Sequence, residues 1–207
     1  MLEFTRDAPV PYSACYNRIL AAITLGKEIK TYRVLNTFVA MPIRSGKTTV
    51  SKKLVYDLVE KGYTKIGYCV SSALECNNAD FSDLEEVFIS VKKFTGSQIR
   101  SKSLGVPFEI IIVDEAESFS NESIIELNKM MCQKVYLFTP NCYNPRNPTE
   151  LKNLWDTSLA FKFQLTGHDL GFEDDQLAMY YSSRGTEDRR VQTQVECNWF
   201  AENTKEN

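Results

Sequence analysis

The sequence holds a single histidine, His168, and none of its six cysteines forms a Cys-x-x-Cys pair. A zinc site needs three or four closely spaced Cys or His ligands, so these absences argue against a zinc centre. Scattered cysteines are also unlike the dense disulfide frameworks of small secreted domains. We therefore expect free thiols and a reducing compartment.

Long hydrophobic runs are missing as well. No stretch approaches the roughly 18 apolar residues that a membrane-spanning helix requires. The N-terminus lacks the basic and apolar regions of a signal peptide. Hydrophobic residues (43%) and charged residues (25%) occur in the proportions of an ordinary globular domain. We expect a cytoplasmic protein that makes no contact with membranes.

The chain also carries little net charge, −3 at pH 7. This value does not identify a nucleic-acid binder, although a DNA motor needs only one surface that faces the polymer. The segment 90–107 has four basic residues and no acidic one, and its polar residues and glycine predict mostly loop. Its basic residues are Lys92, Lys93, Arg100 and Lys102. Two interpretations stay open, a solvated basic face and a loop that contacts the DNA backbone.

The most informative motif that is present runs from Arg44 to Thr49, Arg-Ser-Gly-Lys-Thr-Thr. In a phosphate-binding loop, backbone amides cradle the phosphates, the lysine binds the β- and γ-phosphates, and the following hydroxyl ligates Mg²⁺. Lys47 and Thr48 would have these roles. The motif is imperfect because Met41 stands where the first glycine of the pattern is expected. Its alternative interpretation is a surface lysine in an ordinary strand-to-helix turn.

The flanking segments favour the phosphate loop. We predict a buried strand over 35–40 and a helix over 48–61, whose apolar residues recur at helical spacing. Strand, loop and helix is the arrangement that this chemistry requires, because free amides at a helix N-terminus point at the phosphates. The loop residues expected to contact ATP are Met41, Pro42, Ile43, Arg44, Ser45, Gly46, Lys47, Thr48 and Thr49.

A second motif lies in the segment 108–117, FEIIIVDEAE. Its β-branched residues 110–113 predict a central parallel strand that is buried on both faces. Asp114 and Glu115 follow at the carboxyl end of this strand, where ligands bind in open α/β sheets. We predict that Asp114 holds Mg²⁺ and that Glu115 acts as the general base for the attacking water. The alternative is a pair of acidic residues that merely opens a loop.

The rest of the chain alternates between predicted strands and predicted helices. Further strands are predicted at 65–71, 134–139 and 160–165, and helices near 16–23, 81–91, 120–131 and 149–155. In the third of these helices we expect Ser120 to be the N-cap and Ile124, Ile125, Leu127 and Met131 to point mostly inward. Such alternation predicts a three-layer α/β P-loop NTPase of the RecA/ASCE kind with a mostly parallel sheet. We assign 1–166 to this ATPase domain and 167–207 to a linker or extension.

Together, these motifs resemble the ATPase domain of viral terminase large subunits, the motors that package DNA into a preformed capsid. The resemblance rests on a phosphate loop with an arginine but no first glycine, and on four further segments. These are Pro11-Tyr12 before a helix, Asp114-Glu115-Ala116, Thr139-Pro140-Asn141 at a strand end, and the segment 194–200, which is similar to the exit toward a nuclease domain.

The resemblance implies further roles. Tyr12 would lie near the adenine. Arg44 would join Lys47 and Glu115 in catalysis by contacting the γ-phosphate, or would instead contact a neighbouring subunit. Thr139, Pro140 and Asn141 would couple hydrolysis to DNA movement. The implied cofactors are ATP and Mg²⁺. The implied partners are double-stranded DNA, the portal and capsid, further copies in a ring, and a separate nuclease or small terminase subunit, all at the procapsid in the host cytoplasm.

The chain also departs from the family pattern. Ser13 stands where the family has a glutamine, and 207 residues leave no room for the nuclease domain. The same motifs resemble the first motor domain of superfamily 2 helicases, which is the main alternative. A degenerate nucleotide-binding assembly factor is a second alternative. Met41 in place of glycine favours it, whereas the presence of both Lys47 and Glu115 argues against it.

Overall fold

A six-stranded, fully parallel sheet forms the centre of the molecule, with the strand order β3-β2-β4-β5-β1-β6. The computed structural model describes residues 13–28, 36–85, 90–99, 107–140 and 149–170, together with Gly185, Val191, Val195, Cys197 and Trp199. The strands are β1 Asn36–Ala40, β2 Lys65–Val70, β3 Ser90–Thr95, β4 Ile110–Val113, β5 Gln133–Phe138 and β6 Ala160–Gln164. The α-helices are α1 Ser13–Glu28, α2 Lys47–Glu60, α3 Ala73–Asn78, α4 Ser82–Glu85, α6 Asn121–Lys129 and α7 Thr149–Thr157, and two 3₁₀ turns are η1 Gly96–Gln98 and η2 Ala116–Ser118.

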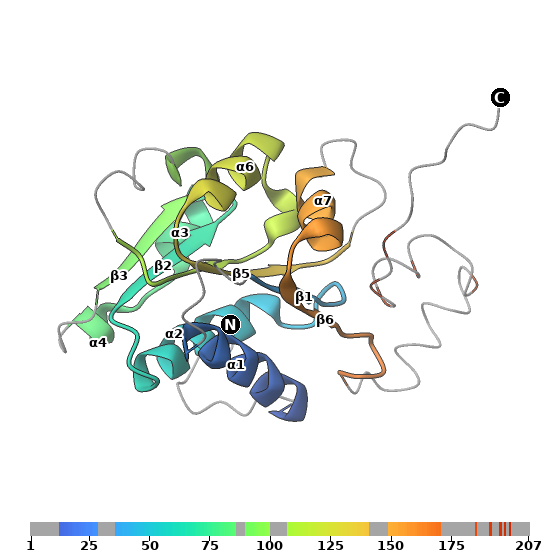
Figure 1. Ribbon diagram of the computed structural model, residues 1–207, viewed down its shortest axis with the longest axis horizontal. Coiled ribbons are helices and arrows are strands. Elements are labelled where there is room, and N and C mark those ends of the chain that lie inside the picture. Colours follow the sequence, from blue (N-terminus) through green and yellow to red (C-terminus); the bar gives the residue numbers. More distant parts are fainter. Residues whose placement is uncertain are drawn as a thin grey trace.

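Helices cover both faces of this sheet, which confirms the predicted three-layer P-loop NTPase architecture (Figure 1). The side chains of strand β4 show how the helices pack on the two faces. Successive strand residues point to opposite faces, so Ile110 and Ile112 pack with α1 and α2, whereas Ile111 and Val113 pack with α6 and α7. All four side chains are fully buried. The run of β-branched residues therefore marks a central strand, as its composition predicts.

The predicted helix over 81–91 is confirmed at 82–85 and wrong at 90–91, and residues 86–89 lie outside the described residues. The only helix described there is the short α4, and Ser90 and Val91 already belong to β3, which pairs with β2. The expected basic loop therefore begins as an edge strand. Helix α3 was not anticipated, although its start carries a capping box in which Ser72 accepts from the amide of Glu75 and the Glu75 carboxylate accepts from the amide of Ser72.

Helix α6 begins as predicted, because the Ser120 side chain accepts a hydrogen bond from the Ser123 amide. The inward placement was wrong for two residues, since Ile125 is 39% and Met131 is 85% exposed. The helix ends at Lys129, and the next residue is already in an extended conformation. Met131 therefore lies in the turn before β5, outside the helical periodicity used to place it.

Described residues beyond position 166 pack against the domain. The amide of Gly167 donates to the carbonyl of Val195 at 3.0 Å, and Val195 and Cys197 are buried. The ring of Trp199 lies 5.3 Å from that of Phe138, at the end of β5. Within the described part of the chain, no helix combines the length and hydrophobicity needed to cross a membrane.

Candidate nucleotide-binding site

The strand order brings three motifs to one edge of the sheet. Strand β5 lies between β1 and β4, and all three run in the same direction. The phosphate loop after β1, Thr139 after β5 and Asp114 after β4 therefore meet at the carboxyl edge, where open α/β sheets bind their ligands. Residues that lie up to 98 positions apart in sequence come into contact here.

The loop itself has the backbone that its glycine predicts. Gly46 has φ 82° and ψ 28°, a left-handed conformation that favours glycine, and α2 begins at the next residue. Arg44 also has a positive φ of 58°. Met41, which replaces the first glycine of the motif, does not make the loop degenerate. Its side chain is fully buried in the core, and its amide donates to the carbonyl of Phe138, which extends the β1–β5 ladder by one residue.

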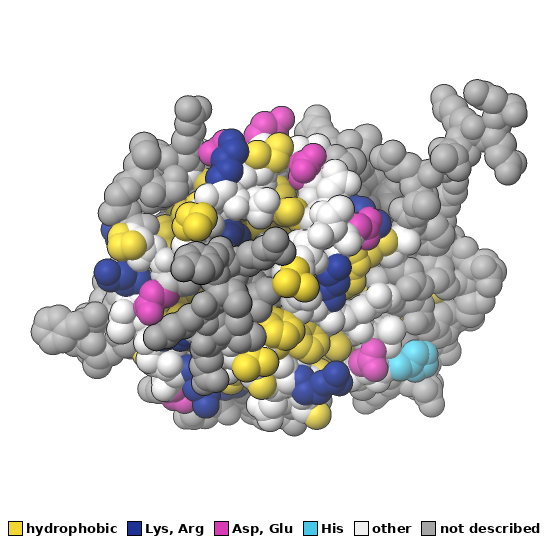
Figure 2. Space-filling model, viewed as in Figure 1, with side chains coloured by type: hydrophobic (Ala, Val, Ile, Leu, Met, Phe, Trp, Pro, Cys, Tyr) yellow, Lys and Arg dark blue, Asp and Glu magenta, His cyan; other side chains and the backbone are white. Residues whose placement is uncertain are grey.

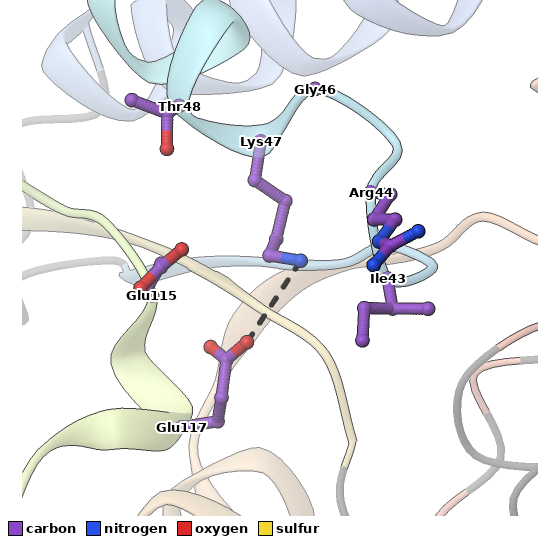
Figure 3. A pocket seen from close by; sticks show the side chains of 7 residues that line it. All are labelled: Ile43, Arg44, Gly46, Lys47, Thr48, Glu115 and Glu117. Atoms are coloured by element: carbon purple, nitrogen blue, oxygen red, sulfur yellow. Dashed lines mark ion pairs between the residues drawn. The ribbon is translucent and has the colours of Figure 1, made fainter.

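Lys47 reaches from the start of α2 into the cavity between the motifs (Figure 3). Its ammonium donates to the Thr139 hydroxyl at 2.6 Å and to the carbonyl of Pro42 at 3.3 Å, and forms an ion pair with Glu117 at 3.9 Å. The Thr139 hydroxyl donates in turn to the carbonyl of Met41 at 2.8 Å. The end of β5 is thus connected directly to the phosphate loop.

Asp114 is almost fully buried, and two side chains that the sequence did not single out orient it. The Ser51 hydroxyl and the Tyr68 hydroxyl donate to its Oδ2 at 2.9 and 3.1 Å. Burial raises the pKa of this carboxyl, against the opposing effect of hydrogen bonds from Ser51, Thr48 and Tyr68. Ser51 lies one turn of α2 after Thr48, a spacing that a helical reading of the loop could have revealed.

Glu115 lines the cavity from a strained backbone position. It has φ 52° and ψ 48°, which a residue with a side chain rarely adopts and which is a feature of functional sites. Burial raises the pKa of its carboxyl, and the negative charges of Glu75 and Asp114 raise it further. A carboxyl tuned upward in this way is suited to accept a proton near neutral pH.

Seven residues line the cavity, which has a volume of about 530 Å³ and lies within the size range of small-ligand sites. They are Ile43, Arg44, Gly46, Lys47, Thr48, Glu115 and Glu117. Figure 3 shows Thr48 and Glu115 on one side of the cavity, Lys47 and Glu117 in its middle, and Ile43 and Arg44 on the loop at the other side. The predicted loop residues and the predicted base therefore share one space.

Glu117 is the cavity residue to which sequence analysis gave no role. It lies on η2, two residues beyond Glu115, and its Oε2 atom is buried without a hydrogen-bond partner among the described residues. Burial raises its pKa to about 7. The signal in the sequence was a third acidic residue two positions after the Asp-Glu pair.

The donor set fits a nucleotide-bound Mg²⁺. Burial raises the pKa values of Asp114, Glu115 and Glu117, and the positive charge of Lys47 opposes the rise in each. A hard divalent cation would relieve this excess of carboxyl groups. The Thr48 hydroxyl is close enough to lower the pKa of Asp114, so the two predicted metal-binding side chains lie near each other.

Other predicted residues lie away from this cavity or outside the described residues. Lys92 and Lys93 are exposed on the edge strand β3, and Lys93 donates to the carbonyl of Ala79 at 2.5 Å. On the face shown in Figure 2, the described Lys and Arg side chains are scattered among acidic and apolar ones. Pro140 is buried beside Thr139. Tyr12, Arg100, Lys102 and Asn141 lie outside the described residues.

Solved structures of similar architecture include large terminases of bacteriophages. The large terminase of a thermophilic bacteriophage, in complex with ADP, aligns with a TM-score of 0.59 and 12% identity over 88% of this chain. The fold is that of a phage large-terminase ATPase domain. The ATPase domain of the Thermus phage P74-26 large terminase aligns with a TM-score of 0.56 and 11% identity, over 88% of this chain and 93% of that domain.

Sequence comparison gives a weaker relation. The replication factor C small subunit of Saccharolobus solfataricus is 28% identical over 107 residues, which is 52% of this chain and 30% of that subunit. No protein-family model matches the sequence. The alignment with the ADP-bound terminase covers 53% of that protein's length. At these low identities, the structural similarity establishes the fold alone. The terminase resemblance expected from the motifs is confirmed at the level of the fold.

Proposed function

We propose that this chain is an ATP-hydrolysing motor domain that drives double-stranded DNA into a viral capsid, as the ATPase part of a terminase large subunit. One observation carries the ATPase part of the proposal. Lys47, Thr48 and Glu115 line a single cavity, and Asp114 lies beside Thr48. These are the groups that phosphoryl transfer to water requires, in one place.

The role of each residue follows from its position at the cavity. Amides at the start of α2 and the ammonium of Lys47 bind the β- and γ-phosphates. Thr48 and Asp114 would hold Mg²⁺, which would supply positive charge to neutralise the phosphates. Glu115 takes the proton of the attacking water, and Arg44, on the same loop, stabilises the charge that develops on the γ-phosphate.

The comparisons support nucleotide binding and leave the DNA substrate to experiment. The large terminase of the thermophilic bacteriophage was solved with ADP and with ATP-γ-S, and its fold is the fold of this chain. The terminase fold favours DNA, the portal and a ring of copies as partners, with a nuclease or small subunit on another chain. The similarity to a replication factor C small subunit favours, as a second candidate, an ATPase that acts on nucleic acid outside packaging.

The test is ATP turnover of the full chain with and without double-stranded DNA. Lys47→Ala should lower turnover by roughly 10²-fold or more, because it removes the charge that stabilises the transferred phosphate. Lys61→Ala, at the exposed far end of α2, is the matched control and should retain wild-type turnover. Wild-type turnover in Lys47→Ala would remove the ATPase proposal.

A second arm separates the two DNA-related candidates. A packaging motor should protect DNA from nuclease only when portal-bearing procapsids are present. Strand separation or turnover that procapsids do not affect would favour the second candidate.

A further inference from the structure

The Glu117 carboxylate is directed at Lys47 from the opposite wall of the cavity (Figure 3). Its Oε1 lies 3.9 Å from the Lys47 ammonium. Among the described residues, Glu117 is the only carboxylate within 4.0 Å of that ammonium. In the absence of nucleotide, Glu117 therefore supplies the negative charge that the phosphates would otherwise supply.

This arrangement is unfavourable for Glu117 itself. Its Oε2 is buried and accepts no hydrogen bond from the described residues. A buried carboxylate with an unsatisfied oxygen costs free energy. Burial raises its pKa to about 7 in spite of Lys47 and of backbone hydrogen bonding from Glu117 and Thr139. The carboxylate is thus held in place chiefly by a lysine that the substrate also needs.

The same two residues connect to the end of β5. Lys47 donates to the Thr139 hydroxyl at 2.6 Å, and the Thr139 backbone is one of the groups that stabilise the Glu117 carboxylate. Thr139 is therefore a hydrogen-bonding neighbour of both members of the Lys47–Glu117 pair.

We propose that Glu117 is a positioning residue that holds Lys47 as its counter-ion in the empty site and senses the γ-phosphate. A triphosphate competes with Glu117 for the ammonium and places additional negative charge beside a poorly solvated carboxylate. Both effects are strong in a low-dielectric cavity. The displaced carboxylate releases Thr139, which passes the state of the nucleotide to the end of β5. This inference rests on the nucleotide-binding function proposed above.

The test compares two nucleotides on the Glu117→Gln variant, which removes the charge and keeps the shape. By titration calorimetry with Mg²⁺, the Kd for ATP-γ-S should fall by about tenfold or more, since a like-charge contact is relieved. The Kd for ADP should change by less than about threefold, because ADP lacks the γ-phosphate. A purely structural role would change stability without changing the ratio of the two Kd values.

Two further variants make the comparison specific. Glu122→Gln, an exposed residue of α6 outside the cavity, makes the same chemical change and should leave both Kd values unchanged. Glu117→Asp retains the charge and should retain the wild-type ratio. If Glu117→Gln does not fold, Glu117→Met also removes the charge at similar length and carries the same expectation.

The outcomes are distinct. Unchanged or weaker binding of ATP-γ-S by Glu117→Gln, or equal tightening for both nucleotides, would overturn the sensing role. A wild-type chain that binds neither nucleotide would instead overturn the nucleotide-binding function, and this inference with it.

Discussion

At the residue scale, the site places one lysine close to three carboxyl groups. Asp114, Glu115 and Glu117 all have pKa values raised by burial, and Lys47 lowers each of them. Their surroundings nevertheless differ. Asp114 accepts from two hydroxyl groups, whereas Glu115 faces the open cavity. The hydrogen-bonded carboxylate is suited to hold a cation, and the carboxylate at the cavity is suited to act as a base.

Glu115→Gln should separate nucleotide binding from hydrolysis. The amide cannot accept the proton of the attacking water, so we expect turnover to fall by roughly 10²-fold or more while ATP binding persists. The measurement is single-turnover hydrolysis beside equilibrium binding of ATP. Glu122→Gln serves as the control outside the cavity. Normal hydrolysis by the Glu115 variant would show that another group is the base.

At the scale of elements, the decisive feature is the position of β5 between the phosphate-loop strand and the Asp114 strand. Because of this order, the residue that follows β5 contacts Lys47 on one side and the carbonyl of Met41 on the other. A change at the γ-phosphate can therefore reach β5 without passing through the core.

Thr139→Ala should break coupling and leave nucleotide binding largely intact. The loss of one hydroxyl should change ATP affinity by no more than about fivefold, the worth of a single hydrogen bond. Stimulation of hydrolysis by DNA and the movement of DNA should be lost. Thr139→Ser keeps the hydroxyl and is the matched control. If Thr139→Ala is stimulated and moves DNA as the wild type does, the motif is only a strand end.

The edge strand β3 carries the described part of the basic segment. Lysine on an edge strand also discourages unwanted strand pairing, which is a structural reason for Lys92 and Lys93 to be there. If these lysines instead contact DNA, Lys92→Glu with Lys93→Glu should weaken DNA binding and reduce the log–log salt slope by about one per lost phosphate contact. The measurement is DNA affinity over a series of salt concentrations.

The control for this experiment makes the same charge change elsewhere. Lys61→Glu with Lys129→Glu places two reversals at exposed helix ends away from β3. An equal effect of both double variants would indicate general electrostatics, and no effect of either would leave β3 as a solvated edge.

At the scale of the whole molecule, the aligned fold covers 93% of the P74-26 ATPase domain. Arg44 lies at the cavity and is exposed, so it is accessible to a neighbouring copy. If the motor works as a ring, turnover per chain should rise with protein concentration as copies associate. Turnover and light scattering should be measured over the same concentration series. Constant turnover per chain together with a monomeric mass would contradict the ring.

The sequence by itself determined the features that depend on neighbours along the chain. The β-branched run of β4, the phosphate loop with its helix, the N-cap at Ser120 and the acidic pair after β4 all follow from local spacing and composition. Local patterns are informative because helical and strand periodicities express themselves within a few residues. At residues 90–91, local spacing predicted the end of a helix, and the pairing of β3 with β2 prevailed.

Only the tertiary structure determined which of these segments are in contact. The contact of Lys47 with Thr139 spans 92 positions, and the contacts of Asp114 with Ser51 and Tyr68 span 63 and 46. Such contacts depend on strand order and on which element covers which face, and these follow from the packing of the entire core rather than from any short segment. For the same reason, Glu117 was an unassigned acidic residue in the sequence and became the partner of the phosphate-loop lysine only in the folded chain.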